Sequence, residues 1–453
     1  MSQGGGIYRH VWLTTVSPLH VVPHGVYAPS TVEGNISNRS ATSVVLTSDG
    51  GATVQVQTTI RNLLGFIVNA TLSSSAINPR GVWVPPVSTI VSVPAGGMLT
   101  VAQSLAIADP WLWSLDAPSL YTLVTEVTQL GGGVDRVNTT FGIRKLHFDS
   151  DHGFFLNDQH VPVRGLCNHQ DFGGVGVAVP DRIQVHRVTA LKEMGGNAWR
   201  CAHNPPNPEL LDATDNLGML VWNENRMYGP HDSYDRSNPS PGHQPGYQNH
   251  SLVGVMEDVK AMILRDRNHP SVIWWSLCNE QGCMVSPDSN QQFAASFAAR
   301  VKAEIQVLDS TRPVTAAVSS DFGQGTSLAL DVQGINYNYG ILDSFHAAHP
   351  TVPIVSSETA ACTCARGQYI TNATAGHMSQ YHCIEDQCLG GTTLQQGVSE
   401  LEQRSFVMGG FFWSGFDYLG EPAPYSWPER NSNWGIHDLA GFRKVSVPAD
   451  RKP

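Results

Sequence analysis

Two glutamates in this chain stand in sequence contexts that suit acid–base or nucleophilic chemistry. Glu280 ends the run WWSLCNE and Glu358 ends the run PIVSSE, and both runs are short and mostly apolar, which is typical of buried strands. Paired carboxylates without a metal-ligand pattern indicate cleavage of a glycosidic bond: one protonates the leaving oxygen while the other attacks the anomeric carbon. A separation of ~5 Å between the two carboxyl groups predicts retention of the anomeric configuration, and a separation of ~6.5 to 9.5 Å predicts inversion. The sequence does not determine this separation.

Further polar and aromatic side chains stand at the ends of apolar segments. They are His169, Arg200, His203, Asn279, Tyr337 and Trp413. Each alone could be a loop histidine, a helix cap or a core residue, but stability would favour apolar strand ends over this combination. A nucleophile must remain ionised beside a cation such as Arg200, whereas an acid must remain protonated. We therefore assign Glu358 as the nucleophile and Glu280 as the acid/base.

The elements that must position these residues change in character along the chain. Residues 7–145 form β-branched runs separated by Gly, Pro, Asn and Ser, a pattern typical of a β-sandwich. From residue 160 onward, short apolar strands alternate with helical segments, which indicates a parallel sheet. The predicted strands lie near residues 160–166, 197–202, 219–224, 272–277, 313–318, 330–337, 354–357 and 410–413. Eight strands favour a (β/α)8 TIM barrel. A doubly wound open sheet is the alternative, but no Gly-rich phosphate loop follows the first strand.

Composition narrows the classes of function. The 453 residues include 43 Gly and 28 Pro, with 41% hydrophobic and 14% charged residues, which is typical of a loop-rich globular protein. A net charge of -11 without a Lys/Arg cluster disfavours nucleic-acid and membrane-surface partners. No apolar run approaches the ~20 residues that a membrane-spanning helix needs. We expect a carbohydrate substrate and leave oligomerisation open.

The spacing of the cysteines bears on metal binding, and the glycosylation sequons bear on the location of the protein. The eight cysteines form no paired CxxC or zinc pattern, so we predict neither a metal nor a cofactor. Cys362 and Cys364 follow Glu358 and are interpreted as loop thiols in preference to a redox pair or metal ligands. The N-terminal segment lacks the features of a signal peptide, so six glycosylation sequons leave the location unknown. These are Asn35, Asn38, Asn69, Asn138, Asn249 and Asn372.

Four segments resemble glycoside hydrolase family 2, and in particular its β-galactosidases. They are RGLCNHQDFGGVGVAVP, NAWRCAHNPPNPELLDATDNLGMLVWNE, RDRNHPSVIWWSLCNE and GGFFWSGFDYLGEPAPYSWP, and the resemblance extends over residues 6–444. It implies an immunoglobulin-like sandwich followed by a catalytic barrel. It also implies a retaining exo-β-glycosidase that hydrolyses terminal non-reducing β-D-galactosides by double displacement.

The resemblance also implies a role for each candidate residue. Glu280 would be the acid/base and Glu358 the nucleophile, and Asn279 would contact the sugar 2-hydroxyl. Tyr337 and Arg200 would support the nucleophile. The sugar pocket would be shaped by His169, His203 and Trp413. Asp417 and Glu421 lie in the segment WSGFDYLGEP, where a turn is an equally good explanation, and are left outside the catalytic set.

Departures from the family pattern define the expected domains. We assign residues 1–16 to the end of a sugar-binding jelly roll, 17–145 to the sandwich and 146–453 to a barrel truncated at its C-terminus. Most of the jelly roll and the last barrel helix are then missing, which would expose strand-eight side chains such as Phe411. Arg226, Met227 and Tyr228 replace the Glu-x-His magnesium ligands of some members.

Two alternatives to β-galactosidase activity stay open. A β-glucuronidase or β-mannosidase belongs to the same family, but a glucuronidase needs cations for the substrate carboxylate, and no Asn-Lys pair lies near the eighth strand. The other alternative is a truncated, inactive remnant that binds carbohydrate. Loss of the jelly roll and of the last helix favours it, and the presence of both glutamates opposes it.

Overall fold

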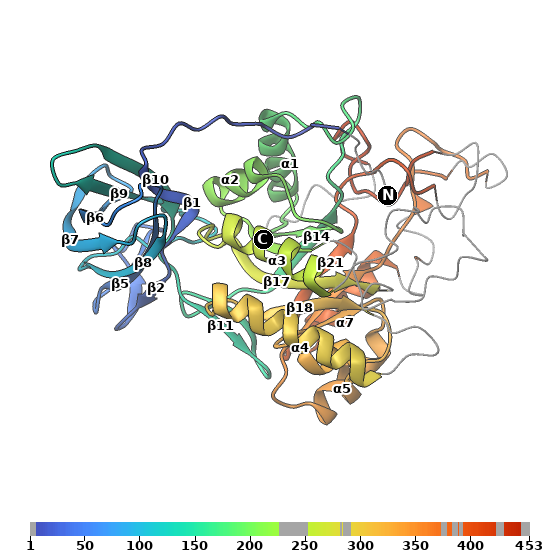
Figure 1. The fold of residues 1–453 in the computed structure, drawn as a ribbon. Helices are drawn as coiled ribbons and strands as arrows, with labels where there is room; N and C mark the ends of the chain where they lie inside the picture. Colours follow the sequence, from blue (N-terminus) through green and yellow to red (C-terminus); the bar gives the residue numbers. More distant parts are fainter. Residues whose placement is uncertain are drawn as a thin grey trace.

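The computed structural model describes residues 6–225, 252–280, 283, 291–372, 378–382, 388, 393–422 and 430–444. Figure 1 shows a β-rich part, coloured blue to teal, beside a larger part in which helices surround a parallel barrel. The predicted fold class, a β-sandwich followed by an eight-stranded barrel, is confirmed. Residues 226–228, Asn249 and the segment after Lys444, for which the sequence also gives predictions, lie outside the described residues.

The sandwich consists of two antiparallel four-stranded sheets. One contains β1 (Leu19–Tyr27), β2 (Ser30–Val32), β5 (Ala52–Asn62) and β8 (Met98–Ile107), and the other β6 (Val68–Ile77), β7 (Trp83–Val93), β9 (Tyr121–Gln129) and β10 (Val134–Phe141). A short hairpin, β3 (Ile36–Asn38) and β4 (Leu46–Ser48), lies beside them. Every second residue of β5 is buried, because side chains of a strand alternate between its faces and only one face meets the core.

The barrel strands pair in chain order, and the first closes on the last. They are β14 (Val163–Asn168), β15 (Ala198–Cys201), β16 (Leu220–Glu224), β17 (Val272–Asn279), β18 (Val314–Val318), β19 (Gln333–Asn336), β20 (Ile354–Thr359) and β21 (Val407–Trp413). All eight lie where the sequence predicts them. Every residue of β17 is buried, as expected for a parallel strand covered on both faces.

Helices cover the outside of the barrel. They are α1 (Asp181–Glu193), α2 (Pro208–Leu217), α3 (Leu252–Asp266), α4 (Gln291–Leu308), α5 (Leu342–Ala348) and α7 (Leu394–Glu402), with the 3-10 turns η3 (Gly325–Ala329) and η4 (Tyr339–Ile341). Apolar residues of α1 to α4 form a continuous core with the outer faces of β14 to β18. The described part of the chain holds no helix with the length and apolar content needed to cross a bilayer.

The expectation that Phe411 is exposed is wrong. Its ring is fully buried inside the barrel, 5.7 Å from the ring of Trp222, and fills the space left by Gly165 on the neighbouring strand. The alternation of β21 turns Phe411 inward, and the half-buried Phe412 has the opposite orientation. A small sheet of β11 (Leu146–Asp149), β12 (Gly153–Leu156) and β13 (Gln159–His160) contributes rings to the same inner core.

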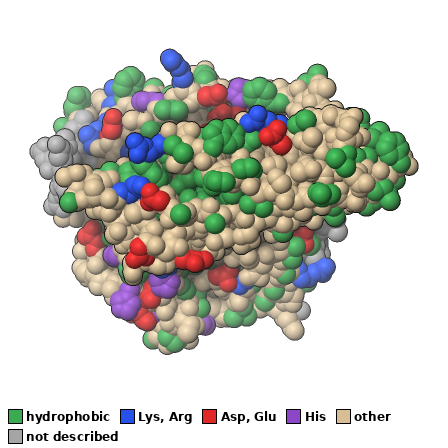
Figure 2. All heavy atoms as spheres, turned by 90° about the vertical axis from the view of Figure 1, so that its left-hand side faces the viewer, with side chains coloured by type: hydrophobic (Ala, Val, Ile, Leu, Met, Phe, Trp, Pro, Cys, Tyr) green, Lys and Arg blue, Asp and Glu red, His purple; other side chains and the backbone are tan. Residues whose placement is uncertain are grey.

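Figure 2 views the molecule from the sandwich side, where apolar and uncharged polar side chains cover most of the surface. Exposed apolar residues of β7 and β8 include Trp83, Ile90 and Met98. Every sequon asparagine within the described residues is exposed. These are Asn35, Asn38, Asn69, Asn138 and Asn372.

A buried carboxylate joins the sandwich to the barrel. Asp309 follows α4 and accepts hydrogen bonds from the Tyr27 hydroxyl at 2.6 Å and the Trp275 indole at 2.8 Å, and it pairs with Arg312 at 2.6 Å. Burial alone would raise the pKa of Asp309, but Arg312 and the hydrogen bonds outweigh it and lower this pKa well below its usual range. The sandwich and the barrel therefore share one ionised group.

We expect Asp309→Asn to reduce the free energy of unfolding by about 3 kcal/mol at pH 7, because it leaves Arg312 buried without its counter-charge. A carboxyl with a depressed folded-state pKa stabilises the fold above its unfolded pKa of about 4, and this contribution is lost as the pH falls towards the folded value. The difference between variant and wild type should therefore shrink below about pH 4. Chemical denaturation across this range tests it. The control Asp343→Asn, at an exposed ion pair with Arg404, should change stability by less than about 0.5 kcal/mol.

Candidate active site

The predicted site residues converge at the barrel mouth, the end at which the carboxyl ends of the strands meet. Direct hydrogen bonds or ion pairs join Arg200, His203, Asn279, Tyr337 and Glu358 in one cluster. Glu280 reaches this cluster through Asn336. His169 and Trp413 form an aromatic wall against His203. The structure therefore brings all eight predicted residues together.

Arg200 on β15 is the electrostatic centre of the mouth and is fully buried. Its Nη1 lies 2.7 Å from Glu358 Oε1, and its Nη2 donates to Asn279 Oδ1 at 2.7 Å. Burial would lower the pKa of Arg200, but Glu224 and Glu358 outweigh it and raise this pKa well above the usual value. A permanent cation therefore lies in direct contact with the Glu358 carboxyl group.

Glu224 is a member of the site that the sequence reasoning missed. It ends β16, is fully buried, and pairs with Arg200 through both oxygens at 3.0 Å. It also accepts hydrogen bonds from Trp222 at 2.8 Å and Ser276 at 3.1 Å, and it lies 2.7 Å from His203 Nδ1. Although burial raises its pKa, Arg200 and His203 outweigh this and lower it. Glu224 therefore holds the planar guanidinium of Arg200 in the orientation that meets Glu358.

Glu280 has a different environment from Glu358. It follows β17 directly, remains partly exposed, and accepts a hydrogen bond from Asn336 Nδ2 at 3.0 Å. Ser357 in turn donates to Asn336 Oδ1 at 2.6 Å and fixes that amide. Burial, followed by the negative charge of Glu358, raises the pKa of Glu280 above its usual value. Glu280 therefore keeps its proton to a higher pH than an ordinary glutamate does.

Three residues at or beside these carboxylates have a strained backbone. Glu280, Tyr337 and Ala360 all have positive φ angles, of 43°, 55° and 42°. Side chains other than glycine rarely adopt this region, and each such residue costs on the order of 1 kcal/mol or more. Tyr337 uses this conformation to reach Glu358: its backbone N–H donates to the Glu358 carbonyl at 2.8 Å, and its hydroxyl hydrogen-bonds to the carboxylate. Burial and then Glu358 raise the pKa of Tyr337 well above its usual value, so the hydroxyl remains a donor.

Aromatic rings form one wall of the mouth. The Trp413 indole stacks on His203 with a centroid distance of 5.3 Å and meets His169 edge-on at 5.4 Å. Its Nε1 donates to the Tyr418 hydroxyl at 3.0 Å, and that hydroxyl donates to Glu421 at 2.8 Å. Glu421 therefore anchors the wall. Such ring faces suit the apolar C–H face of a sugar.

Asp417 forms a buried ion pair outside the carboxylate cluster. It is buried and pairs with Lys444 at 2.7 Å, and Lys444 also donates to two backbone carbonyls. Burial raises the pKa of Asp417 to about 6, although Lys444 opposes this rise. The pair connects the segment after β21 to residues 430–444 and lies outside the carboxylate cluster.

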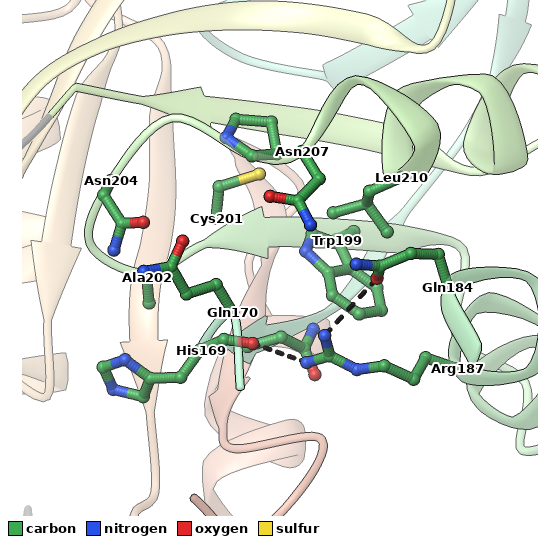
Figure 3. A pocket seen from close by; sticks show the side chains of 12 residues that line it. His169, Gln170, Gln184, Arg187, Trp199, Cys201, Ala202, Asn204, Asn207 and Leu210 are labelled. Atoms are coloured by element: carbon green, nitrogen blue, oxygen red, sulfur yellow. Dashed lines mark hydrogen bonds between the residues drawn. The ribbon is translucent and has the colours of Figure 1, made fainter. Parts of the chain in front are cut away.

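A small cavity lies behind the first strand, between β15, α1 and α2 (Figure 3). Its volume of about 20 Å³ holds roughly one water molecule and excludes a sugar. Arg187 lines it and donates to Gln184 and to the backbone carbonyl of His169 at 2.5 Å. Burial and then His203 lower the pKa of His169 well below its usual value, so this imidazole is neutral near pH 7. Its Nε2 is buried and makes no hydrogen bond within the described residues.

The interpretation of Cys362 and Cys364 as loop thiols is wrong. Cys362 forms a disulfide with Cys388, and Cys364 is also disulfide-bonded. A further disulfide joins Cys278 and Cys283 and encloses Glu280. The predicted pattern failed because disulfide pairing depends on distance in the fold, and these spacings are not a recognised motif.

A possible cation site lies away from the mouth. The N-terminal segment crosses over α1 and α2 (Figure 1), and His10 lies 2.9 Å from Asp181 and 3.7 Å from Glu209 at the first turns of these helices. The hydrogen bond between the His10 imidazole and the accepting Asp181 carboxylate raises the pKa of His10. His10 and Asp181 are exposed, and acidic residues are ordinary at helix N-termini, so we assign no metal to them.

Comparison with known proteins identifies the relatives of this barrel. The family model "Glycosyl hydrolases family 2, TIM barrel domain" matches residues 150–430, and "Glycosyl hydrolases family 2" matches residues 36–144. A β-galactosidase of Bacteroides ovatus is 32% identical over 97% of this chain and 54% of its own length. A β-glucuronidase of Bacteroides fragilis is 28% identical over 91% of this chain and 57% of its own length.

Solved structures give the same result. A glycosyl hydrolase family 2 member from Bacteroides cellulosilyticus superposes with a TM-score of 0.79 at 28% identity, covering 98% of this chain and 51% of that one. Bacteroides uniformis β-glucuronidase gives 0.76 at 26% identity, covering 97% and 52%. The chain spans about half the length of these relatives.

An eight-stranded parallel barrel with carboxylates at the strand ends has the layout of a barrel enzyme. The chain belongs to glycoside hydrolase family 2.

Proposed function

We propose that this protein is a retaining β-glycosidase that removes terminal non-reducing β-D-galactosyl groups. The observation that carries this proposal is the contrast between the two glutamates. Glu358 lies 2.7 Å from a permanently charged Arg200, whereas the pKa of Glu280 is raised by burial and by Glu358. One carboxyl is thus prepared to attack and the other to donate a proton, which is the division of roles that double displacement requires.

The proposed reaction has two steps. In the first, Glu358 attacks the anomeric carbon while Glu280 protonates the departing glycosidic oxygen, which leaves a glycosyl ester on Glu358. In the second, Glu280 removes a proton from water, and the resulting oxygen attacks the anomeric carbon and releases Glu358. We assign Asn279, whose Oδ1 accepts a hydrogen bond from Arg200, to the contact with the sugar 2-hydroxyl. His169 offers a neutral imidazole, and Trp413 an apolar wall.

The choice of galactose rests on two kinds of support. The β-galactosidase of Bacteroides ovatus aligns with 97% of the chain at 32% identity. Within the described residues, three buried cations near the mouth are also already engaged: Arg200 by carboxylates, Arg187 by the His169 carbonyl and Lys444 by Asp417. A uronic acid substrate would need a further cation for its carboxylate. A β-glucuronidase remains the second candidate, since relatives of 28% identity carry that name.

Covalent trapping tests the proposal. We would incubate the protein with an activated 2-deoxy-2-fluoro-β-galactoside, measure the intact mass, and map the modified peptide. We expect one added fluorogalactosyl group on Glu358 in wild type and none in Glu358→Gln. If an adduct forms only with the matching glucuronide or mannoside, that sugar and not galactose is the substrate. If no sugar forms an adduct, an inactive carbohydrate-binding protein is favoured.

Replacing Glu280 should affect substrates according to their leaving groups. We expect Glu280→Ala to lower kcat/KM by roughly 10² to 10⁴-fold for an alkyl galactoside, whose leaving group needs a proton. The first step on a dinitrophenyl galactoside should change much less, because that leaving group departs unaided. The alkaline limb of the wild-type kcat/KM profile should lie above the ordinary glutamate pKa of about 4.3 and should be absent from the variant. An equal loss on both substrates would contradict the assignment of Glu280 as the acid.

A further inference from the structure

The carboxyl end of β17 carries a disulfide that none of the roles above uses. Cys278 is the last residue before Asn279 and Glu280, and it is bonded to Cys283, with the two Cα atoms 5.4 Å apart. The bond therefore closes a ring of six residues in which Glu280 lies between the two cysteines.

One end of this ring is anchored in the barrel core. Cys278 is buried against the outer layer of helices, together with Val255 of α3 and Ala298 of α4. Its neighbour Asn279 points the other way, into the mouth, where Arg200 holds it. The register of β17 against β18 shifts between Ser276 and Asn279, and Leu277 and Cys278 both lie in the outer core. The disulfide therefore fixes the strand end from the outside, while Asn279 fixes it from the inside.

The other end of the ring holds the backbone of Glu280 itself. The backbone N–H of Cys283 donates to the Glu280 carbonyl at 2.7 Å, and Cys283 is buried in the same core. Glu280 has a φ of 43°, a conformation that costs on the order of 1 kcal/mol or more and persists only where its surroundings impose it. Cys278 and Cys283, which are both buried and are joined by the disulfide, supply the covalent constraint among those surroundings.

We propose that the Cys278–Cys283 disulfide is a positioning element that holds the carboxyl of Glu280 at the distance and angle needed for proton transfer. This inference rests on the proposed function. The two cysteines are positioning residues because they act through the backbone of Glu280 and touch no reacting atom. A displacement of about 1 Å in such a group can lower a rate by on the order of 10²-fold. The working enzyme therefore contains this pair in its oxidised form, as expected of a protein that matures in an oxidising compartment.

The test is the double variant Cys278→Ala, Cys283→Ala, preceded by a non-reducing peptide map that verifies the bond in wild type. We expect kcat/KM for an alkyl galactoside to fall by roughly 10 to 10²-fold, with little change in KM. Formation of the fluorogalactosyl adduct from a dinitrophenyl donor needs no acid and should proceed at nearly the wild-type rate. Added azide should accelerate turnover of the double variant and yield a β-galactosyl azide, because a small anion replaces the displaced base. A general loss of structure would produce none of this selectivity.

The matched control removes the other described disulfide with Cys362→Ala, Cys388→Ala. That pair follows β20, the strand that carries Glu358, and does not enclose Glu280. Its removal should leave the ratio of the rates on the alkyl and dinitrophenyl galactosides unchanged. If the first double variant forms no adduct, Cys283→Ala alone is measured in the same way, since it keeps the Cys278 side chain in the core. Equal losses on both substrates, or wild-type rates on both, would overturn the inference. A wild-type protein that forms no adduct would instead refute the proposed function.

Discussion

Replacing Glu358 with glycine should abolish turnover of every β-galactoside, lowering kcat by roughly four to six orders of magnitude. The reason is that the groups left beside the anomeric carbon are poor nucleophiles: Arg200 is a cation, and the raised pKa of Tyr337 keeps its hydroxyl protonated. Azide should restore part of the activity with an activated substrate by entering the space of the lost carboxylate. Its attack from that side inverts the anomeric centre, so the product should be an α-galactosyl azide.

The configuration of the azide product distinguishes the proposed roles of the two glutamates. An α-azide from Glu358→Gly together with a β-azide from Glu280→Ala would place the two carboxyls on opposite sides of the anomeric carbon. A β-azide from both variants would contradict the assignment of Glu358. Glu421→Ala is the matched control, since this carboxylate lies near the mouth but accepts its hydrogen bond from Tyr418, and its loss should retain measurable unassisted activity.

Arg200→Met should cause a large loss of stability. Arg200 is fully buried and balances Glu224 and Glu358, so its removal leaves two carboxylates without a counter-charge. Breaking a buried pair in this way costs about 3 to 5 kcal/mol. The penalty should decrease at lower pH, because protonation of Glu224 removes part of the unbalanced charge. Chemical denaturation at several pH values measures this effect.

Arg312→Met provides the comparison for Arg200. Arg312 is also buried beside a carboxylate, but it lies at the junction with the sandwich. We expect similar destabilisation from both substitutions, while only Arg200→Met prevents formation of the fluorosugar adduct at a temperature where both variants remain folded. Adduct formation at the wild-type rate in Arg200→Met would show that Glu358 does not need this cation.

Strand ends explain why much of the site could be predicted from the sequence. In a parallel barrel all strands point in one direction, so a polar residue that closes an apolar run reaches the same mouth as the others. Glu280, Glu358 and Arg200 were found in this way, and the closed barrel brings them together. The same pattern occurs in LVWNE, where Glu224 ends an apolar run. Charge balance is a second signal for Glu224, because a buried arginine that contacts Glu358 needs another partner to fix its position.

Other features depend on contacts that the sequence does not encode in a short pattern. The disulfides join cysteines whose proximity follows from the path of the loops. The burial of Phe411 follows from the register of β21 against β14, where Gly165 leaves room for its ring. A shift of one residue would turn that ring outward, and an unaligned sequence fixes registers poorly.

The electrostatic coupling between the two glutamates has a consequence for the timing of proton transfer. The negative charge of Glu358 is the second contribution, after burial, to the raised pKa of Glu280. In the proposed double displacement, the sugar esterifies Glu358 and removes that charge, so the pKa of Glu280 must fall. The residue that held its proton while the glycosidic bond was intact then becomes the base that water needs, and it recovers its affinity for a proton when hydrolysis frees Glu358. The covalent state of one carboxyl thus sets the protonation state of the other, and the catalytic cycle resets itself without an external signal.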